Sequence, residues 1–532
     1  MRPGTNAIEG YKSSRNGDGL QIREEMSRLI GQGWESLAPA EIELLKWVGV
    51  FFRKPTPGRF MMRVRMPNGF TRSSQLHAIA DLSRRLGDCV VDITTRQQIE
   101  LRGFPLGSVP EIWERLRGVD LHSLQTGQDN VRNINGCALA GLTRHETFDA
   151  SAVVFALDQQ LVGTDGNPEF TNLPRKFNVT ITACLENCTH NESQDVALVP
   201  AAKQGRLGFN VLVGGKMGSG GFTPAQPLDI FVLPHHASDV VAELARIFRD
   251  HGPREARSKC RFRFLVDEWG IWRLQRELEG RLGRKLESSG WDMRRPTHSD
   301  HLGTTVLREP GMVSVGLCVP TGRMNPNQVD ELARLADEYG DGQVRLTVGQ
   351  NAIVPNIAEG SVPALLSEPL LRELPARPSP FVRRLVTCVG TDYCNLAQIE
   401  TKARALSISK RLEEEFGTEL EPVSIHWSGC PAGCGNHQAG EIGLRGLKAN
   451  IDGKVIDAVA VYVGGQTGPE TKVGEQILDV VPCEQLPEVL SAIARGRGLL
   501  REKPAPARPH DAPLVQISTP PAAPNDRSKQ NQ

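Results

Sequence analysis

One order of secondary-structure elements occurs twice in this sequence, and that duplication constrains the fold more than any other feature. The pattern of apolar residues predicts a strand, a helix, two strands and a helix at 60–66, 73–86, 90–94, 98–104 and 109–117. The same order returns at 312–320, 327–339, 343–348, 351–357 and 362–374. Two such units about 250 residues apart predict an internal duplication, whose halves could pair into one pseudo-symmetric domain. Chance similarity of two α/β units is the alternative.

The two copies also share local sequence. Ile93-Thr94-Thr95-Arg96-Gln97-Gln98 in the first aligns with Leu346-Thr347-Val348-Gly349-Gln350-Asn351 in the second. At the position of Arg96 the second copy has the uncharged Gly349. The two copies therefore differ in charge at this position.

The rest of the chain divides around these copies, and the fold class is α+β. A mixed α/β region lies between the copies and another follows the second copy. The last residues are rich in Pro, Ala and charge and predict a disordered tail. The expected units are an N-terminal helical segment at 1–50, half-domains at 51–125 and 308–376, mixed domains at 127–300 and 380–500, and the tail at 503–532.

Composition excludes several classes of protein. The 62 basic residues balance the 62 acidic ones, whereas a nucleic-acid-binding protein usually has a basic excess. No run of apolar residues is long enough to span a membrane, and the polar N-terminal sequence has no apolar signal core. We therefore expect a cytoplasmic protein that binds neither nucleic acid nor membrane, with its cysteines reduced.

Four of the eleven cysteines form two tight pairs. Cys388 and Cys394 make a C-x5-C motif, and Cys430 and Cys434 make a C-x3-C motif. A predicted helix at 396–416 could return the chain so that the pairs meet. Four thiolates satisfy a 4Fe–4S cluster. A zinc site and ordinary buried cysteines remain open, although zinc pairs more often have the spacing C-x2-C or C-x4-C.

These motifs resemble those of the siroheme-containing nitrite and sulfite reductases. The resemblance rests on the cysteine spacing and on two segments, Ile399-Glu400-Thr401-Lys402-Ala403-Arg404-Ala405 and His426-Trp427-Ser428-Gly429-Cys430. It extends from about residue 50 to residue 500. It is strongest to the ferredoxin-dependent assimilatory nitrite reductases. It implies the α+β architecture with ferredoxin-like half-domains, a siroheme and a 4Fe–4S cluster. In this family the last cysteine, here Cys434, ligates a cluster iron and bridges to the siroheme iron.

Two features depart from this pattern or lie outside it. The family usually has Asn in the C-x3-C loop, where this chain has Ala432. Cys184 and Cys188 form a second C-x3-C with His190 nearby, but no partner pair lies close in sequence and the family places no ligand there. We expect the isolated cysteines, which are Cys89, Cys137, Cys260, Cys318 and Cys483, to be buried apolar residues.

The resemblance also implies an anion site on the open face of siroheme. The family's first arginine corresponds to Arg63, in the segment Phe60-Met61-Met62-Arg63. Its second arginine corresponds to Arg132, in Asp129-Asn130-Val131-Arg132-Asn133. The remaining two residues are Lys176 and Asn178, in Leu173-Pro174-Arg175-Lys176-Phe177-Asn178. In an extended segment Lys176 and Asn178 project from one face. Arg96 is the candidate partner of a siroheme carboxylate. Without the resemblance, each of these residues would be interpreted as a solvated surface residue.

The Lys-x-Asn sequence favours nitrite over sulfite. Sulfite reductases of this family tend to have Lys-x-Lys there, and one cation fewer weakens attraction for the more highly charged sulfite. The implied activity is the six-electron reduction of nitrite to ammonia by a monomer that takes electrons from ferredoxin, since no G-x-G-x-x-G follows a strand. The alternatives are an assimilatory sulfite reductase, a non-catalytic electron-transfer module and a zinc-stabilised binding or scaffold protein.

Overall fold

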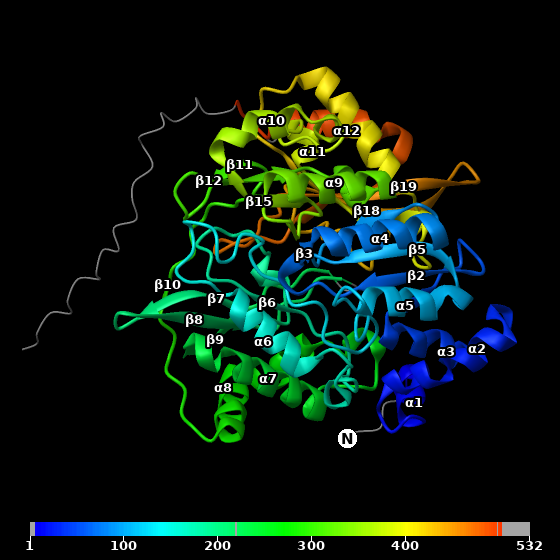
Figure 1. Cartoon of the computed structure of the whole chain (residues 1–532), viewed down its shortest axis with the longest axis vertical. Helices are drawn as coiled ribbons and strands as arrows, with labels where there is room; N and C mark the ends of the chain where they lie inside the picture. Colours follow the sequence, from blue (N-terminus) through cyan, green and yellow to red (C-terminus); the bar gives the residue numbers. More distant parts are fainter. Residues whose placement is uncertain (1–5, 219–220, 497, 503–532) are drawn as a thin grey trace, which may run out of the picture.

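The computed structural model describes residues 6–218, 221–496 and 498–502. The predicted tail at 503–532 lies outside the described residues. At the N-terminal end, short helices α1 (Ala7–Ser13), α2 (Met26–Gln32) and α3 (Pro39–Leu44) lie beside the first half-domain (Figure 1). Leu29, Leu44 and Trp47 from this segment are buried in the same apolar core as that half-domain. The N-terminal segment is therefore packed against the duplicated unit and shares its core.

The two predicted copies form two five-stranded sheets with the same order of elements. The first copy comprises β1 (Val50–Phe52), β2 (Arg59–Val64), β3 (Phe70–Arg72), α4 (Ser73–Leu86), β4 (Val91–Ile93), β5 (Ile99–Pro105) and α5 (Val109–Arg117). The second comprises β11 (Gly303–Val306), β12 (Met312–Leu317), β13 (Arg323–Met324), α9 (Pro326–Tyr339), β14 (Gln343–Leu346), β15 (Ala352–Ala358) and α10 (Val362–Ser367). Each copy contributes one strand to the sheet of the other, because β13 pairs with β4 and β3 pairs with β14. The duplication predicted from sequence is confirmed as an exchange of edge strands.

The pseudo-twofold relation extends to single side chains. Gln97 and Gln350, aligned by sequence, both have a left-handed backbone, with φ +56° and +65°. The Gln97 amide donates to the Leu346 carbonyl at 2.9 Å, and the Gln350 amide donates to the Ile93 carbonyl at 2.9 Å. One apolar core runs through both copies. These reciprocal bonds hold the two loops 94–98 and 347–351 against each other's sheet.

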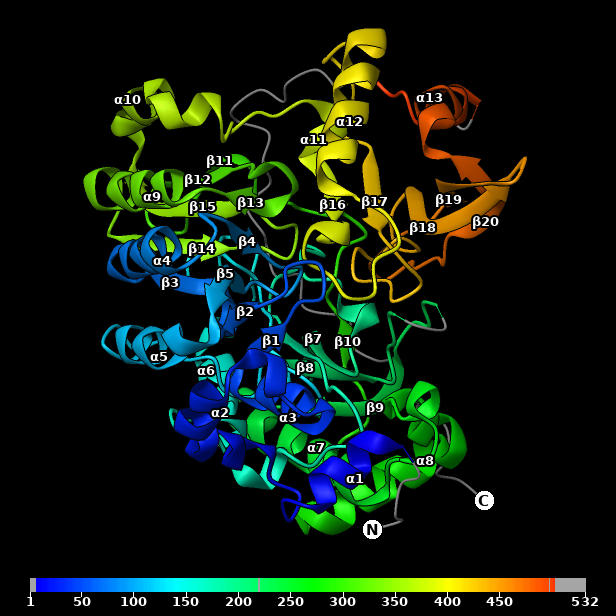
Figure 2. The same ribbon diagram turned by 90° about the vertical axis from the view of Figure 1, so that its right-hand side faces the viewer.

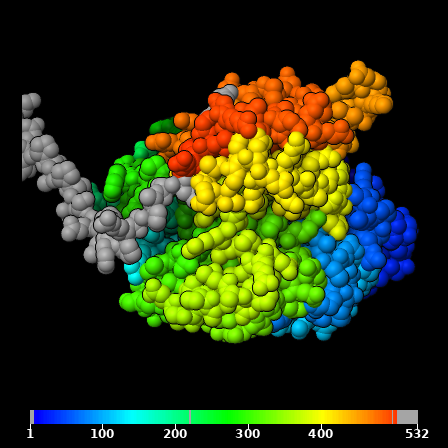
Figure 3. Space-filling view, turned by 90° about the horizontal axis from the view of Figure 1, so that it is seen from above, coloured from blue at the N-terminus to red at the C-terminus, as the bar shows by residue number. Residues whose placement is uncertain are grey.

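The two mixed regions lie beside the central pair of copies (Figure 2). The first has the sheet β6 (Val179–Ile181), β7 (Val196–Lys203), β8 (Arg206–Val213), β9 (Gln226–Val232) and β10 (Trp291–Asp292), covered by α6 (Ser151–Leu161), α7 (Ala237–His251) and α8 (Phe262–Leu282). The second has α11 (Pro380–Arg383), β16 (Arg384–Thr387), α12 (Lys402–Phe416), β17 (Ser424–Ser428), β18 (Ile442–Ile451), β19 (Lys454–Val463), β20 (Glu475–Pro482) and α13 (Leu486–Gly496). This last segment, yellow to red, forms one continuous body beside the second copy (Figure 3). The α+β class is therefore confirmed.

Two predicted helices are shorter than expected, and each has a local cause. The helix predicted at 362–374 ends at Ser367, because Glu368 precedes Pro369 and takes an extended backbone. The helix predicted at 396–416 begins only at Lys402. Before it, the Leu396 N–H donates to the Cys394 sulfur at 3.4 Å and the Gln398 N–H donates to the Gly429 carbonyl at 2.8 Å. In a longer helix the Leu396 and Gln398 N–H groups could not make these contacts, because the helix would direct them along its own axis.

A buried ion cluster joins both copies to the C-x5-C loop. Asp92 of β4 is 2% exposed and is paired with Arg102, with Arg323 at 2.9 Å and with Lys402 at 3.5 Å. Arg323 also bonds to Asp392 at 2.9 Å, between Cys388 and Cys394. Burial alone would raise the pKa of Asp92, but the charges of Lys402 and Arg102 hold it well below its usual range. The cluster therefore stabilises the interface at the first cysteine pair.

Replacing Asp92 with Asn should destabilise the protein by about 3–5 kcal/mol, because the buried Arg102 and Lys402 and the half-buried Arg323 would lose their shared anion. Because the pKa of Asp92 is lower in the folded chain than in the unfolded one, its contribution is present above about pH 4 and is lost as the pH falls further. Thermal unfolding at pH 7 measures the loss. Asp330→Asn is the matched control, since its partners Arg84 and His77 are exposed and we expect a change below about 1 kcal/mol. Equal effects of the two substitutions would contradict the prediction.

Candidate active site

The fold brings the two cysteine pairs to one edge of a sheet. β16 and β17 are adjacent parallel strands connected through α12, and Cys388 follows the first while Cys430 and Cys434 follow the second. The carboxyl ends of neighbouring parallel strands lie at the same edge, so loops leaving them meet. The Cys388 N–H donates to the Trp427 carbonyl at 3.0 Å, which fixes the first loop against the second. The pairing of the motifs expected from sequence therefore has a structural cause.

Backbone N–H groups point at the sulfurs. Gly429 donates to the Cys388 sulfur at 3.0 Å, and Leu396 donates to the Cys394 sulfur at 3.4 Å. Such bonds stabilise a thiolate and tune the reduction potential of a bound cluster. Both loops require a left-handed residue, Gly390 at φ +65° and Gly433 at φ +68°, and a Cβ at Gly433 would stand 3.0 Å from Gly218.

The cysteines differ in how far they are exposed. Burial raises the pKa of Cys388 to about 11 and that of Cys430 to about 12, so these thiols ionise only when a metal supplies positive charge. Cys430 is buried and Cys388 and Cys394 are half-buried, whereas Cys434 is exposed. One sulfur is thus presented outward from the cysteine loops.

Three cations lie near this exposed cysteine or near one another. Among the described residues, no carboxylate is bonded to any of them. Arg96 lies in the loop between β4 and β5, Arg132 lies beside β6, and Lys176 precedes β6. Arg96 and Lys176 both interact electrostatically with Cys434, and Arg132 interacts with Arg96. Burial lowers the pKa of Arg96 to about 10 and lowers the pKa values of Arg132 and Lys176 well below their usual ranges. Buried cations that repel one another are stabilised when an anion binds between them.

Polar atoms without hydrogen-bond partners lie in this region. One guanidinium nitrogen of Arg132 and the side-chain oxygen of Asn178 are buried and have no hydrogen-bond partner. Phe177 is packed in the apolar core against Phe248 and Phe262, so Lys176 and Asn178 on either side of it turn the other way. Buried polar atoms are ordinarily satisfied. A carboxylate or a small oxyanion could accept from the free Arg132 nitrogen, whereas the Asn178 oxygen requires a donor.

Arg63, the first arginine expected in the anion site, is already engaged. Its guanidinium donates to Glu100 at 2.7 Å and to the Thr126 carbonyl at 3.0 Å and lies over the Phe51 ring. It still interacts electrostatically with both Arg96 and Arg132. The structure therefore brings Arg63 to the same region, with its charge partly balanced by Glu100.

Sequence reasoning missed an ion pair that supports Asn178. Asp195, fully buried, accepts from the Asn178 N–H at 2.8 Å and pairs with Arg261 at 2.8 and 3.2 Å. Arg261 in turn interacts electrostatically with Lys176 and Arg96. No motif identified these residues, because arginine is abundant in the chain and Asp195 and Arg261 are distant in sequence.

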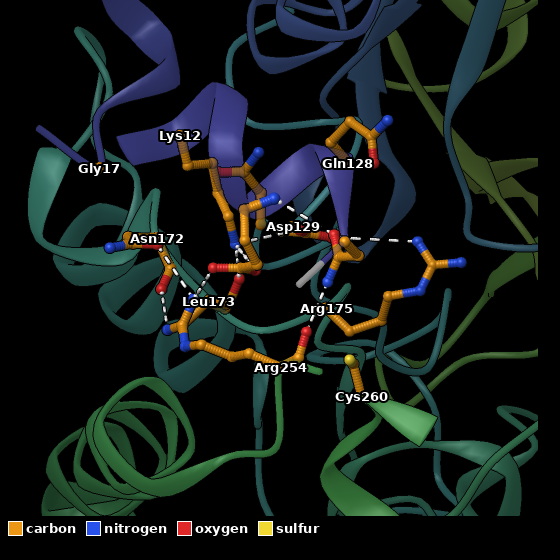
Figure 4. A network of polar contacts seen from close by, with 12 residues as sticks. Lys12, Gly17, Gln128, Asp129, Asn172, Leu173, Arg175, Arg254 and Cys260 are labelled. Atoms are coloured by element: carbon orange, nitrogen blue, oxygen red, sulfur yellow. Dashed lines mark hydrogen bonds and ion pairs between the residues drawn. The ribbon is translucent and has the colours of Figure 1, made fainter. Parts of the chain in front are cut away.

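The loop that carries Arg132 is held by a second buried carboxylate (Figure 4). Asp129 bonds to Lys12 at 3.2 Å and to Arg257 at 2.6 Å, and Arg175 lies 3.9 Å away. Lys12 also donates to the Leu173 carbonyl at 2.9 Å, which connects this loop to the segment that leads to Lys176. The N-terminal helix α1 thereby positions both cationic segments.

Four cysteines on two neighbouring loops, with cations that interact electrostatically with one of them, are the residue types that a redox enzyme acting on an anion requires. Models for the "Nitrite and sulphite reductase 4Fe-4S domain" match residues 127–286 and 379–495, and that for the "Nitrite/Sulfite reductase ferredoxin-like half domain" matches residues 52–119 and 306–371. The chain belongs to the nitrite and sulfite reductase family, and its cofactors are a 4Fe–4S cluster and siroheme. The four motif cysteines therefore belong to a 4Fe–4S domain, and the alternative that they bind zinc in a scaffold protein is excluded.

Individual relatives agree with this assignment. The chain is 44% identical to the ferredoxin–nitrite reductase of Synechococcus elongatus, over 93% of this chain and 96% of that protein. It is 37% identical to the assimilatory ferredoxin-dependent nitrite reductase of Haloferax mediterranei, over 91% and 88% respectively. The solved structure of the NirA protein of Mycobacterium tuberculosis superposes with a TM-score of 0.87 at 26% identity, covering 95% of this chain and 96% of that one. Among the described helices, none is long and apolar enough to cross a membrane.

Proposed function

We propose that this protein is a ferredoxin-dependent nitrite reductase that reduces nitrite to ammonia. The observation that supports this most directly is a cluster of three cations near the exposed Cys434: the buried Arg132 and the half-buried Arg96 and Lys176, none of which is paired with a carboxylate among the described residues. The relatives described above carry the same activity in their names. A small oxyanion provides the negative charge that such a pocket requires.

The residues suited to each cofactor can be named. Cys388, Cys394, Cys430 and Cys434 would hold the cluster, with Cys434 shared with siroheme, and Arg96 would pair with a siroheme carboxylate. When bound, this pair of cofactors would supply the metal that takes up nitrite and would pass on to it, one at a time, the six electrons that ferredoxin delivers. The N–H groups of Gly429 and Leu396 stabilise charge on the two sulfurs they contact.

The side chains of the pocket bind the substrate and manage protons. Arg132 offers an unused guanidinium N–H, and its fork matches an oxyanion. Arg63 is held in place by Glu100 and adds positive charge at the edge. Lys176, whose pKa burial lowers, gives up its ammonium proton more readily than an exposed lysine and can donate it to a departing oxygen. Asn178 orients an oxygen or amide toward the same space without adding charge.

Steady-state turnover with a reduced viologen dye under anaerobic conditions tests the proposal. We expect kcat/KM for nitrite to exceed that for sulfite at least about a hundredfold, which corresponds to roughly 2.7 kcal/mol at the transition state. One preparation should serve for both anions, so that cofactor loading is the same. A preference for sulfite would overturn the substrate assignment and leave the family assignment unchanged.

Substituting Lys for Asn178 should shift this preference toward sulfite. Asn178 is buried with its side-chain oxygen unpartnered, so a second ammonium there would add charge to the pocket of Lys176. We expect the ratio of kcat/KM for nitrite to that for sulfite to fall about tenfold or more, about 1.4 kcal/mol. Asn178→Gln, which adds length but no charge, is the control. An unchanged ratio in Asn178→Lys would show that this position does not select the anion.

Three further properties are proposed on the family resemblance. We propose that the protein is a monomer, which light scattering during gel filtration would test. We also propose that it works in the cytoplasm, which cell fractionation would test. Finally, we propose that the siroheme and substrate unit extends over 127–300 and the cluster unit over 380–500, in accord with the family matches at 127–286 and 379–495.

A further inference from the structure

The pseudo-twofold relation extends beyond the half-domains into the two mixed sheets. In the first sheet β6 runs parallel to β7, which continues antiparallel through β8 to β9. In the second, β17 runs parallel to β18, which continues antiparallel through β19 to β20. The number of residues between Val179 and its partner Val196 equals the number between Ile425 and its partner Ile442. The sheets can therefore be aligned residue by residue.

That alignment places three cysteines on the cluster motif. Cys184 and Cys188 follow Val179 at the same spacing at which Cys430 and Cys434 follow Ile425. Asn135 pairs with Thr180 as Val386 pairs with His426, and Cys137 and Cys388 each stand two residues further on. The set Cys137, Cys184 and Cys188 is thus the counterpart of Cys388, Cys430 and Cys434.

Cys137 is far from Cys184 and Cys188 in sequence, but the three cysteines meet in the fold. Cys137 is buried as expected, whereas Cys89, also expected to be buried, is exposed. Their exposed fractions are 1% for Cys137, 1% for Cys184 and 7% for Cys188. The Cys184 thiol lies within hydrogen-bonding contact of both others, and those contacts, first with Cys137 and then with Cys188, lower its pKa well below the usual range. The three thiols are thus in mutual contact inside the protein.

A histidine from a distant segment completes the group. His301, 4% exposed, lies between β10 and β11, and its Nε2 is 3.4 Å from the Cys137 sulfur. Its Nδ1 is 3.2 Å from the Ser299 hydroxyl, the kind of second contact that orients a metal-binding imidazole. His301 also holds a left-handed backbone, with φ +56°, which is uncommon for a residue with a side chain. His190, which sequence placed near this motif, instead stacks on His426.

The spacing of the ligand atoms decides which metal centre fits. Among the described residues, Cys137, Cys188 and His301 form the one group of such ligands whose atoms all lie within 4.8 Å of one another. Around one tetrahedral zinc ion, with Zn–S near 2.3 Å, ligand atoms stand about 3.8 Å apart. A 4Fe–4S cluster binds each thiolate on a different iron and spreads them more widely. Cys137, Cys188 and His301 therefore suit a single ion, and Cys184, which is outside that group of atoms, contacts both of its cysteines.

We propose that Cys137, Cys184, Cys188 and His301 bind one zinc ion in a closed, structural site. Three thiols and one imidazole are a common zinc ligand set, and binding releases the thiol protons. Cys188 and His301 also line a cavity of ≈ 620 Å³, through which an ion can reach them. The same cavity is lined by Gly349, the uncharged counterpart of Arg96. The duplication thus leaves one half with redox cofactors and the other with a structural metal.

The position of the site indicates what the ion would stabilise. His301 belongs to the connection between the first mixed domain and the second half-domain, and its neighbour Asp300 pairs with Arg383 at 2.7 Å. On the other side, Gln97 bonds both the N–H and the carbonyl of Gly136, next to Cys137. The ion would hold this connection against the loop that contains Arg96.

Elemental analysis of the purified holoenzyme after dialysis against EDTA tests the proposal. We expect about one zinc per chain in the wild type and less than about 0.2 in Cys188→Ala and His301→Ala, with cluster iron retained. His301→Cys should keep the zinc, because a fourth thiolate replaces the imidazole. Cys318→Ala, which removes a buried cysteine outside the group, should keep it as well.

Three outcomes would overturn the proposal. The wild type could contain no zinc after growth in zinc-supplemented medium. The zinc content could be unchanged in both Cys188→Ala and His301→Ala. The wild type could instead contain extra iron that is lost in Cys188→Ala. If a variant does not fold, zinc-edge X-ray absorption of the wild type can identify the atoms bound to the zinc instead. Three sulfurs near 2.3 Å and one nitrogen near 2.0 Å support the site, and a shell of oxygens and nitrogens only refutes it.

Discussion

Replacing Cys434 with serine should reduce nitrite turnover at least about a thousandfold, a loss of roughly 4 kcal/mol at the transition state. Cys434 is the one exposed cysteine of the two motifs, and it interacts electrostatically with both Arg96 and Lys176. In our proposal its thiolate belongs to both cofactors, so serine removes the connection between electron supply and substrate. Dye-linked turnover, iron content and the visible spectrum measure the effect together.

The control for this substitution is a buried cysteine outside both groups. Cys318 is 2% exposed and directly follows β12 of the second half-domain, and Cys318→Ala should keep full iron and near-normal turnover. Retention of more than about a hundredth of wild-type activity in Cys434→Ser, with full iron, would contradict the shared role of this sulfur.

Replacing Lys176 with methionine should lower kcat/KM for nitrite by about a hundredfold to a thousandfold, or 2.7–4 kcal/mol. Burial lowers the pKa of Lys176, and the positive charges of Arg261, Arg96 and Arg175 lower it further. The lowered pKa makes the ammonium a better proton donor, and because a lysine is charged below its pKa, its contribution is lost as the pH rises. Initial rates across the pH range at saturating and limiting nitrite separate binding from proton delivery.

Lys176→Arg distinguishes charge from proton transfer. Arginine keeps the positive charge but does not give up its proton, so we expect KM near the wild-type value and a reduced kcat. Lys410→Met is the control, because Lys410 is exposed and its contact is with Glu414 on the same helix. If Lys176→Arg restores kcat as well as KM, the residue contributes charge alone.

Sequence alone was sufficient for features that depend on local order along the chain. The two copies, the strand–helix periodicity and the cysteine spacing are short-range patterns, and the boundaries of α4 and α5 agree with those predicted. The resemblance then identified the family that the comparisons confirm. Helix 396–416 was predicted too long, because the sulfur of Cys394 and the carbonyl of Gly429 accept N–H groups ahead of Lys402.

Contacts between distant segments required the tertiary structure. The exchange of β3 and β13, the Asp195–Arg261 pair and the approach of His301 to Cys137 all join residues far apart in sequence. Periodicity records which face of an element is buried, but it does not record which other element covers that face. The sequence by itself therefore determined the family, the cofactor class and the cluster motif. Only the fold decided which cations are left without a partner and which cysteines meet, because burial and charge depend on neighbours brought together from the whole chain.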